Sequence, residues 1–142
     1  MVLDTSFVLP LLGVEVEGVD FDPVEAAMSG CRLYYPALAL PEAYASLFKA
    51  LRKKGLGELP RQAMRGLAVL HSGVVVRLVA PHAADAAVAY RVLRAGWKDF
   101  FDAVMYATAR RLGAPLLTLD ESFRRFLEGR GFDASLLVVY RG

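Results

Sequence analysis

The stretch that decides the fold is FDAVMYATARRLGAPLLTLD, residues 101–120. It predicts a helix that has Asp99 as its N-cap and Asp102 in its first turn, because aspartate is a favoured N-cap residue. Gly113 is expected to end this helix, since glycine readily adopts the left-handed conformation that follows a last turn. Apolar side chains recur in the helix at helical spacing. The buried stripe predicted from them comprises Phe101, Val104, Met105, Thr108 and Leu112.

Strand patterns alternate with helical patterns along the rest of the chain. The predicted strands cover residues 1–3, 31–35, 73–79, 115–119 and 135–140. The other predicted helices cover a turn at 7–12 and the segments 22–29, 58–70, 81–95 and 121–128. This order predicts an α/β fold of three layers, with a central, mainly parallel sheet covered by helices on both faces. No repeat or linker divides the sequence, so a single domain is expected over residues 1–142.

Two prolines allow two interpretations of the segment after the second predicted strand. Either a helix begins at Pro36 and kinks, or a turn leads to a helix that begins at Pro41. Beyond Pro41 the pattern is helical up to Gly55, and it places Glu42 near the start of the helix. The apolar stripe predicted for this helix consists of Leu40, Tyr44, Leu47 and Leu51.

The composition excludes several classes of protein. Of 142 residues, 56% are hydrophobic and the mean hydropathy is +0.37, yet no apolar run approaches the roughly 18 residues of a membrane span. The first residues lack the basic start of a signal peptide and carry Asp4 where that peptide is apolar, so a cytoplasmic protein is expected. The single cysteine, Cys31, excludes an internal disulfide and a cysteine-based zinc site. Its place at the start of a predicted strand indicates core packing.

Four acids are predicted to meet at one edge of the sheet. Asp4 and Asp120 each follow a strand, Glu42 lies on the helix that leaves the second strand, and Asp102 lies in the first turn of the helix that enters the fourth. Sites in open α/β sheets form at the carboxyl ends of the strands, where these carboxylates would repel one another unless a divalent cation bound them. Each acid also has a purely structural interpretation, as a turn residue, a helix cap or part of a solvated helix face.

The pattern resembles the PIN-domain family, in particular the VapC-type toxins of prokaryotic toxin–antitoxin pairs. The matching motifs are VLDTS at 2–6, PALALPE at 36–42, FDA at 101–103 followed by Ala107 and Ala109, and LLTLD at 116–120 followed by Phe123. The resemblance implies a Mg²⁺- or Mn²⁺-dependent ribonuclease on a three-layer α/β/α fold. The residues it implies as both metal ligands and catalytic residues are Asp4, Glu42, Asp102 and Asp120. It places the hydroxyls of Thr5, Ser6 and Thr118 beside them.

Two positions depart from the commonest pattern of the family. Pro41 directly precedes Glu42 and would alter how that acid is presented. Asp99 lies one helical turn before Asp102 and competes with it as the third ligand. Asp102 is preferred because it begins the Asp-Ala-x-x-x-Ala pattern, which leaves Asp99 as the cap and as a supporting residue.

The resemblance also implies an RNA substrate, a homodimer and a small antitoxin as partner. The high apolar content agrees with a protein partner. The net charge of +2 is by itself too small to indicate nucleic acid, although arginine, which binds phosphate with two donors, exceeds lysine. Basic residues that would line a path for RNA are Lys49, Arg52, Lys53, Arg110, Arg124 and Arg125. Candidates for base stacking, with core or dimer packing as the alternative, are Trp97, Phe100 and Tyr106.

Two other functions compete with the nuclease. The first is an oligomeric PIN-like module that binds RNA or a protein without catalysis and whose acids are structural. The second is an aspartyl-phosphate enzyme or receiver-like domain, which also has aspartates at strand ends. Such phosphatases commonly carry a second aspartate two residues after the nucleophile, where this chain has Ser6. Receiver domains need a lysine after the last strand, where this chain has Tyr140 and Arg141, so this function is disfavoured.

Overall fold

The computed structural model describes residues 1–20, 25 and 28–142, and five strands of this part form one sheet. The sheet has the order β3-β2-β1-β4-β5, and every neighbouring pair is parallel. The strands are β1 (Val2–Leu3), β2 (Leu33–Pro36), β3 (Val76–Val79), β4 (Leu116–Thr118) and β5 (Leu137–Val139). The parallel sheet predicted from the alternation of strands and helices is confirmed.

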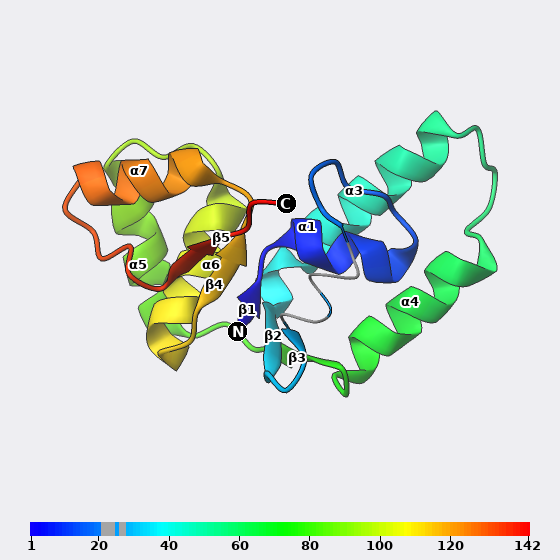
Figure 1. Ribbon diagram of the computed structural model, residues 1–142, viewed down its shortest axis with the longest axis horizontal. Coiled ribbons are helices and arrows are strands. Elements are labelled where there is room, and N and C mark those ends of the chain that lie inside the picture. Colours follow the sequence, from blue (N-terminus) through cyan, green and yellow to red (C-terminus); the bar gives the residue numbers. More distant parts are fainter. Residues whose placement is uncertain (21–24, 26–27) are drawn as a thin grey trace.

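Helices lie on both sides of the sheet and complete a three-layer α/β/α arrangement (Figure 1). One group in Figure 1 consists of α1 (Thr5–Val8), α3 (Leu40–Lys53) and α4 (Arg61–Ser72), and the other of α5 (Ala83–Arg94), α6 (Phe100–Leu112) and α7 (Glu121–Gly129). Two short 3-10 helices are η1 (Leu9–Leu12) and η2 (Ala37–Ala39). Most of the helix predicted over 22–29 falls outside the described residues. None of the helices described combines the length and the apolarity that crossing a membrane requires.

Helix α6 packs against α5 and against three strands of the sheet, β1, β2 and β4. It therefore connects one group of helices to the sheet. Its predicted ends are confirmed, with Asp99 as the N-cap and Gly113 in the left-handed conformation at φ 61°. The predicted buried stripe was too narrow, because every residue from Ala103 to Ala109 is buried. The helix is enclosed on more than one side. Leu112 was placed in the core wrongly; it lies in the last turn and is 36% exposed.

All five strands begin later than the sequence indicated, and the shifts of β2 and β3 change how residues before them are buried. β2 begins at Leu33, because the residues before it form a turn in which Cys31 N donates to Met28 O. Cys31 is therefore exposed, and its predicted core packing is wrong. β3 begins at Val76, and Val74 before it is 85% exposed. Because the residues before Val76 are also β-branched, the predicted strand began before the part of β3 that pairs with β2.

The two prolines after the second strand have separate roles. Pro36 is the last residue of β2, and η2 then turns the chain into α3, which begins at Leu40. Pro41 lies in the first turn of α3, where its missing N–H removes no helical hydrogen bond. The structure thus agrees with a turn that leads to a helix near Pro41, and Glu42 lies in the first turn of that helix.

The sheet order places a switch point between β1 and β4. From β1 the chain moves to β2 on one side, and it later returns from β3 to β4 on the other side. The register pairs Leu3 with Leu117, so Asp4 and Asp120 emerge at the same edge of the sheet. Open α/β sheets bind ligands at the carboxyl ends of strands at such a point.

Candidate metal centre

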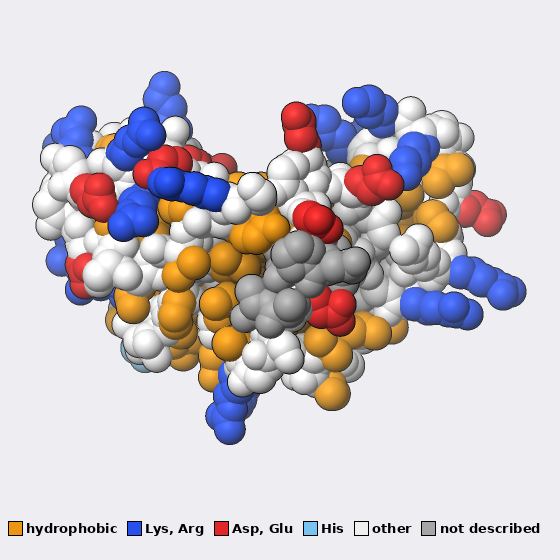
Figure 2. Space-filling model, in the orientation of Figure 1, with side chains coloured by type: hydrophobic (Ala, Val, Ile, Leu, Met, Phe, Trp, Pro, Cys, Tyr) orange, Lys and Arg blue, Asp and Glu red, His pale blue; other side chains and the backbone are white. Residues whose placement is uncertain are grey.

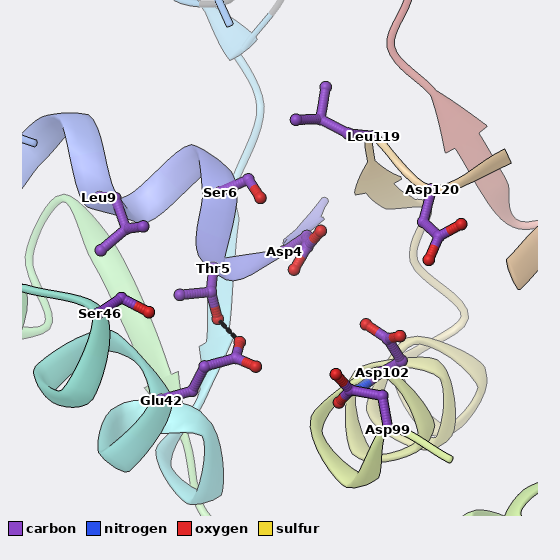
Figure 3. Close-up of a pocket in the computed structure, with 10 residues that line it drawn as sticks. All are labelled: Asp4, Thr5, Ser6, Leu9, Glu42, Ser46, Asp99, Asp102, Leu119 and Asp120. Carbon is purple, nitrogen blue, oxygen red and sulfur yellow. Dashed lines mark hydrogen bonds between the residues drawn. The ribbon is translucent and has the colours of Figure 1, made fainter. Parts of the chain in front are cut away.

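An open pocket of about 490 Å³ is lined by residues at the carboxyl ends of β1 and β4. Figure 3 shows carboxylates that approach this pocket from two walls. The first, called the α1–α3 wall, comprises Asp4, Thr5, Ser6, Leu9, Glu42 and Ser46. The second, called the α6–α7 wall, comprises Asp99, Asp102, Leu119 and Asp120. The structure therefore brings all four predicted ligands together with Asp99, and none of these ten lining residues is basic.

Asp4 lies between β1 and α1, and its carboxylate does not cap the helix. It occupies the N-cap position of α1 but makes no side-chain cap bond. Its Oδ2 instead accepts a hydrogen bond from Thr118 Oγ1 at 3.2 Å, across neighbouring strands. Asp4 N also donates to Leu117 O at 3.0 Å. The carboxylate is thus held by the sheet and is directed into the pocket.

Asp120 both caps α7 and lines the pocket. Its Oδ1 accepts from Phe123 N at 2.9 Å, and its own N–H donates to Thr118 Oγ1 at 3.1 Å. The buried hydroxyl of Thr118 therefore contacts both Asp4 and Asp120. The structural interpretation of Asp120 as a cap and its interpretation as a pocket acid are both correct, because the cap bond uses only one carboxylate oxygen.

Asp99 and Asp102 share the first turn of α6 but are held differently. Asp99 Oδ1 accepts from Phe101 N at 2.8 Å and from Asp102 N at 3.1 Å, which is its predicted capping role. Asp102 Oδ2 accepts from the indole Nε1 of Trp97 at 2.9 Å. The Trp97 ring packs between α6 and the Phe123 ring of α7, at 4.8 Å between centroids. Sequence reasoning missed the bond from Trp97, since nothing in a tryptophan five residues before an acid predicts it.

Glu42 is held by a chain of hydroxyl groups. Thr5 Oγ1 donates a hydrogen bond to Glu42 Oε1. The Tyr35 hydroxyl lies 2.7 Å from Thr5 Oγ1 and donates to Ala39 O at 2.9 Å. The predicted place of a Thr5 hydroxyl beside an acid is therefore found in the structure, and Ser6 also lines the pocket. Tyr35 was not predicted as part of the site, because it lies within a strand pattern that indicates only burial.

Burial and mutual repulsion raise the pKa values of three pocket acids. Burial, followed by the charges of Asp120 and Asp99, raises the pKa of Asp4 to about 6 against the opposing hydrogen bonds. Burial, followed by the charge of Asp99, raises the pKa of Asp102 to about 7. Burial first, and then Asp4 and Asp99, also raise the pKa of Glu42. No ion pair within the described residues includes a pocket acid, so no basic side chain there relieves the repulsion.

The donor chemistry of the pocket suits Mg²⁺ or Mn²⁺, because carboxylates and hydroxyls are the ligands that hard divalent cations prefer. Among the described residues, no three carboxylate, imidazole or thiol groups are gathered closely enough to hold one ion directly as they stand. Mg²⁺ keeps several waters and commonly takes only one or two carboxylates from a protein. The residues present therefore fit such an ion in kind and charge, with Asp4, Glu42, Asp102 and Asp120 as the groups that would hold it.

The predicted basic and aromatic contacts have mixed outcomes. Arg124 pairs with Glu128 at 3.2 Å on α7, whereas Lys49 on α3 is exposed. Tyr106 is completely buried and donates to Asp133 O at 2.8 Å, so it belongs to the core and does not stack on bases. Phe100 is 48% exposed. Arg125 lies 3.9 Å from Glu121, Arg110 lies over the Tyr106 ring, and Arg52 and Lys53 are exposed.

The fold and the pocket define a class of protein, a three-layer α/β/α domain with clustered acids at the switch point of a parallel sheet. The chain belongs to the PIN-domain family, because the model of that family, described as PIN domain, matches residues 1–128. PIN domains are in general metal-dependent nucleases. No curated protein matches the chain. The family predicted from the motifs is confirmed, and the VapC-type subtype stays a prediction.

Proposed function

We propose that this PIN domain is a Mg²⁺- or Mn²⁺-dependent endoribonuclease and the toxin of a VapBC-type toxin–antitoxin pair. The observation that carries the proposal is the pocket of five carboxylates, drawn from the ends of β1 and β4 and the starts of α3 and α6, with no basic lining residue. Such a cluster is costly to keep ionised without a cation. Asp4, Glu42, Asp102 and Asp120 are assigned as ligands and catalytic residues, and Asp99 as a supporting acid.

The proposed reaction is hydrolysis of an RNA phosphodiester. A water oxygen forms a bond to phosphorus and the bond from phosphorus to O3′ breaks, which leaves a 5′-phosphate and a 3′-hydroxyl that takes up a proton. A bound divalent ion supplies a more acidic water and a counter-charge for the phosphate. The chain itself fixes the oxygen ligands: Thr118 orients Asp4, Thr5 orients Glu42, and the cap bond to Phe123 orients Asp120.

Basic side chains support an RNA path across the pocket. Figure 2 shows Lys and Arg side chains on both sides of the hollow between the two groups of helices. Lys49 and Arg52 are exposed on α3 in one group of helices, and Arg125 is exposed on α7 in the other. Exposed cations bind the phosphate backbone without reading the sequence, so they would guide RNA to the acids and would add little preference of their own.

Exposed apolar side chains support protein partners. Phe48 on α3, Leu56 after it and Met64 on α4 are each more than 40% exposed, at 48%, 47% and 53%. We assign the antitoxin to this α3–α4 surface and the homodimer to the surface that carries Tyr90 and Phe100, since exposed apolar groups commonly mark interaction sites. Light scattering after size-exclusion chromatography tests the dimer, and a mass of one chain at all concentrations would contradict it.

Cleavage of structured RNAs with and without Mn²⁺ tests the catalytic proposal. The parent is expected to cleave only with the metal, and Asp4→Asn to lose more than about 100-fold in rate, beyond the losses typical of groups that only support a ligand. Asp133→Asn is the matched control, because Asp133 is an exposed acid outside the pocket. Equal cleavage by the parent and Asp4→Asn would reject the assignment.

The same proteins distinguish the nuclease from a binding module without catalysis. A metal that binds the folded state raises the melting temperature by mass action, so Mn²⁺ should stabilise the parent and not Asp4→Asn. A parent that binds RNA, shows no metal response and cleaves nothing would establish the binding module instead.

A further inference from the structure

The Tyr35 hydroxyl lies behind the α1–α3 wall and joins three segments of the chain. Tyr35 is 0% exposed and lies near the end of β2. Its hydroxyl contacts Thr5 Oγ1 at 2.7 Å and donates to Ala39 O at 2.9 Å. Thr5 is the first residue of α1 and directly follows Asp4, while Ala39 is the N-cap residue of α3 and lies three residues before Glu42. One hydroxyl group therefore connects the two segments that carry the acids of this wall.

This hydroxyl is costly to bury for packing alone. A phenylalanine would fill the same apolar site, whereas a buried hydroxyl must recover its lost hydration through hydrogen bonds. Tyr35 and Thr5 have two hydroxyl protons for three contacts, so when Thr5 donates to Glu42 the single Tyr35 proton is shared between Thr5 Oγ1 and Ala39 O. This shared bond recovers the lost hydration and holds Thr5 in the rotamer from which its Oγ1 reaches Glu42. The orientation of Glu42 thus depends on a side chain that does not itself line the pocket.

Tyr106 offers a direct contrast within the same protein. It is also 0% exposed, and its hydroxyl also donates to a backbone carbonyl, that of Asp133, at 2.8 Å. Arg110 Nη1 approaches the same hydroxyl at 3.4 Å, and neither Asp133 nor Arg110 lines the pocket. Loss of either tyrosine hydroxyl should therefore have a similar cost in stability, but only the Tyr35 hydroxyl is connected to a pocket acid.

We propose that Tyr35 is a positioning residue that fixes Glu42 relative to Asp4 through Thr5 and Ala39, and thereby sets the affinity of the pocket for a divalent cation. The inference rests on the proposed metal-dependent function. Groups that orient metal ligands without touching the metal commonly contribute 10- to 100-fold to metal affinity or activity. The loss of a single oxygen atom from Tyr35 is thus expected to weaken metal binding at a pocket that keeps every one of its carboxylates.

The test compares Tyr35→Phe with Tyr106→Phe in Mn²⁺ titrations followed by calorimetry and by melting temperature. Without metal, both variants are expected to melt below the parent by similar amounts. Tyr35→Phe should then bind Mn²⁺ with a dissociation constant about tenfold higher or more, whereas Tyr106→Phe should bind as the parent does. RNA cleavage by Tyr35→Phe should recover toward the parent rate as Mn²⁺ approaches saturation, because the affinity is changed and the ligands remain.

The other outcomes distinguish failure of the positioning role from failure of the proposed function. Equal Mn²⁺ affinity in Tyr35→Phe and Tyr106→Phe would overturn the positioning role while the proposed function stands. A parent that does not bind Mn²⁺ would overturn the proposed function and this inference with it. If Tyr35→Phe does not fold, Thr5→Val removes the hydroxyl that contacts both Tyr35 and Glu42, and Thr5→Ser restores it. Parent-like affinity in Thr5→Val would then overturn the role, and weakening that Thr5→Ser reverses would support the hydroxyl chain that connects Tyr35 to Glu42.

Discussion

The two walls of the pocket hold their acids in different ways. On the α6–α7 wall, Asp99 and Asp120 are helix N-caps whose carboxylates accept backbone N–H groups two or three residues away. On the α1–α3 wall, Asp4 is held by Thr118 and Glu42 by Thr5, contacts that span 114 and 37 residues of sequence. The acids of one wall are thus positioned mainly by local helix geometry, and those of the other depend on the packing of the whole fold.

The largest expected effect is a loss of RNA cleavage, and it should distinguish the two acids at the start of α6. Asp102→Asn should reduce RNA cleavage by more than about 100-fold, beyond the range of a supporting group, and Asp99→Asn by less than about tenfold. Asparagine keeps a side-chain oxygen and is itself a good N-cap, so Asp99→Asn preserves the start of the helix and removes only a charge. Cleavage rates at saturating Mn²⁺ measure both effects. A larger loss in Asp99→Asn would make Asp99 the third ligand.

Local sequence signals predicted the α6–α7 wall well. Asp99, Asp102 and Gly113 mark the two ends of α6, and Asp120 directly precedes α7, so capping rules found these positions. Glu42 was predicted from its place on the helix that leaves the second strand, and the resemblance to the PIN family implies the same residue. The bonds that hold two of the pocket acids, from Trp97 to Asp102 and through the Tyr35 hydroxyl chain to Glu42, leave no periodic or capping pattern in the sequence.

The predictions that failed were those that inferred burial from residue type or from periodicity alone. Cys31 and Val74 are exposed although both residue types favour strands or cores, because the paired parts of β2 and β3 begin two residues further on in each case. Leu112 fits the helical period of α6 but lies beyond the part of the helix that other elements cover. Periodicity predicts which face of a helix or strand is buried. How much of its length is covered depends on the neighbouring elements of the fold.

A second test disturbs the packing between α4 and η1, which lies next to the α1–α3 wall. Gly66 of α4 packs so closely on η1 that an added Cβ would lie 2.2 Å from Leu11 O, and η1 directly follows α1. Gly66→Ala should lower the free energy of unfolding by about 1–3 kcal/mol, as over-packing commonly does, and should weaken Mn²⁺ binding. Urea denaturation measures the first effect. Gly57→Ala is the control, because nothing lies within 4 Å of a Cβ there; equal stability of the two variants would contradict the close packing.

A third test is the pH dependence of the stability of the metal-free protein. The pKa values of Asp4 and Asp102 rise to about 6 and about 7 in the folded state, so between about pH 4 and pH 7 the unfolded chain releases protons that the folded chain retains. The unfolded state then binds fewer protons, and these groups lower the free energy of unfolding as the pH rises. Urea denaturation across this range should show the decline. Asp102→Asn should flatten it, and an unchanged slope would contradict the raised pKa of Asp102.

The most direct test of the central claim is a crystal structure of the protein grown with Mn²⁺, with anomalous scattering used to locate the metal. The ion is expected between the two walls, bound by carboxylate oxygens from both Asp4 on the α1–α3 wall and Asp102 or Asp120 on the α6–α7 wall. An anomalous map without a peak in this pocket at saturating Mn²⁺, or a peak elsewhere on the molecule, would contradict the account.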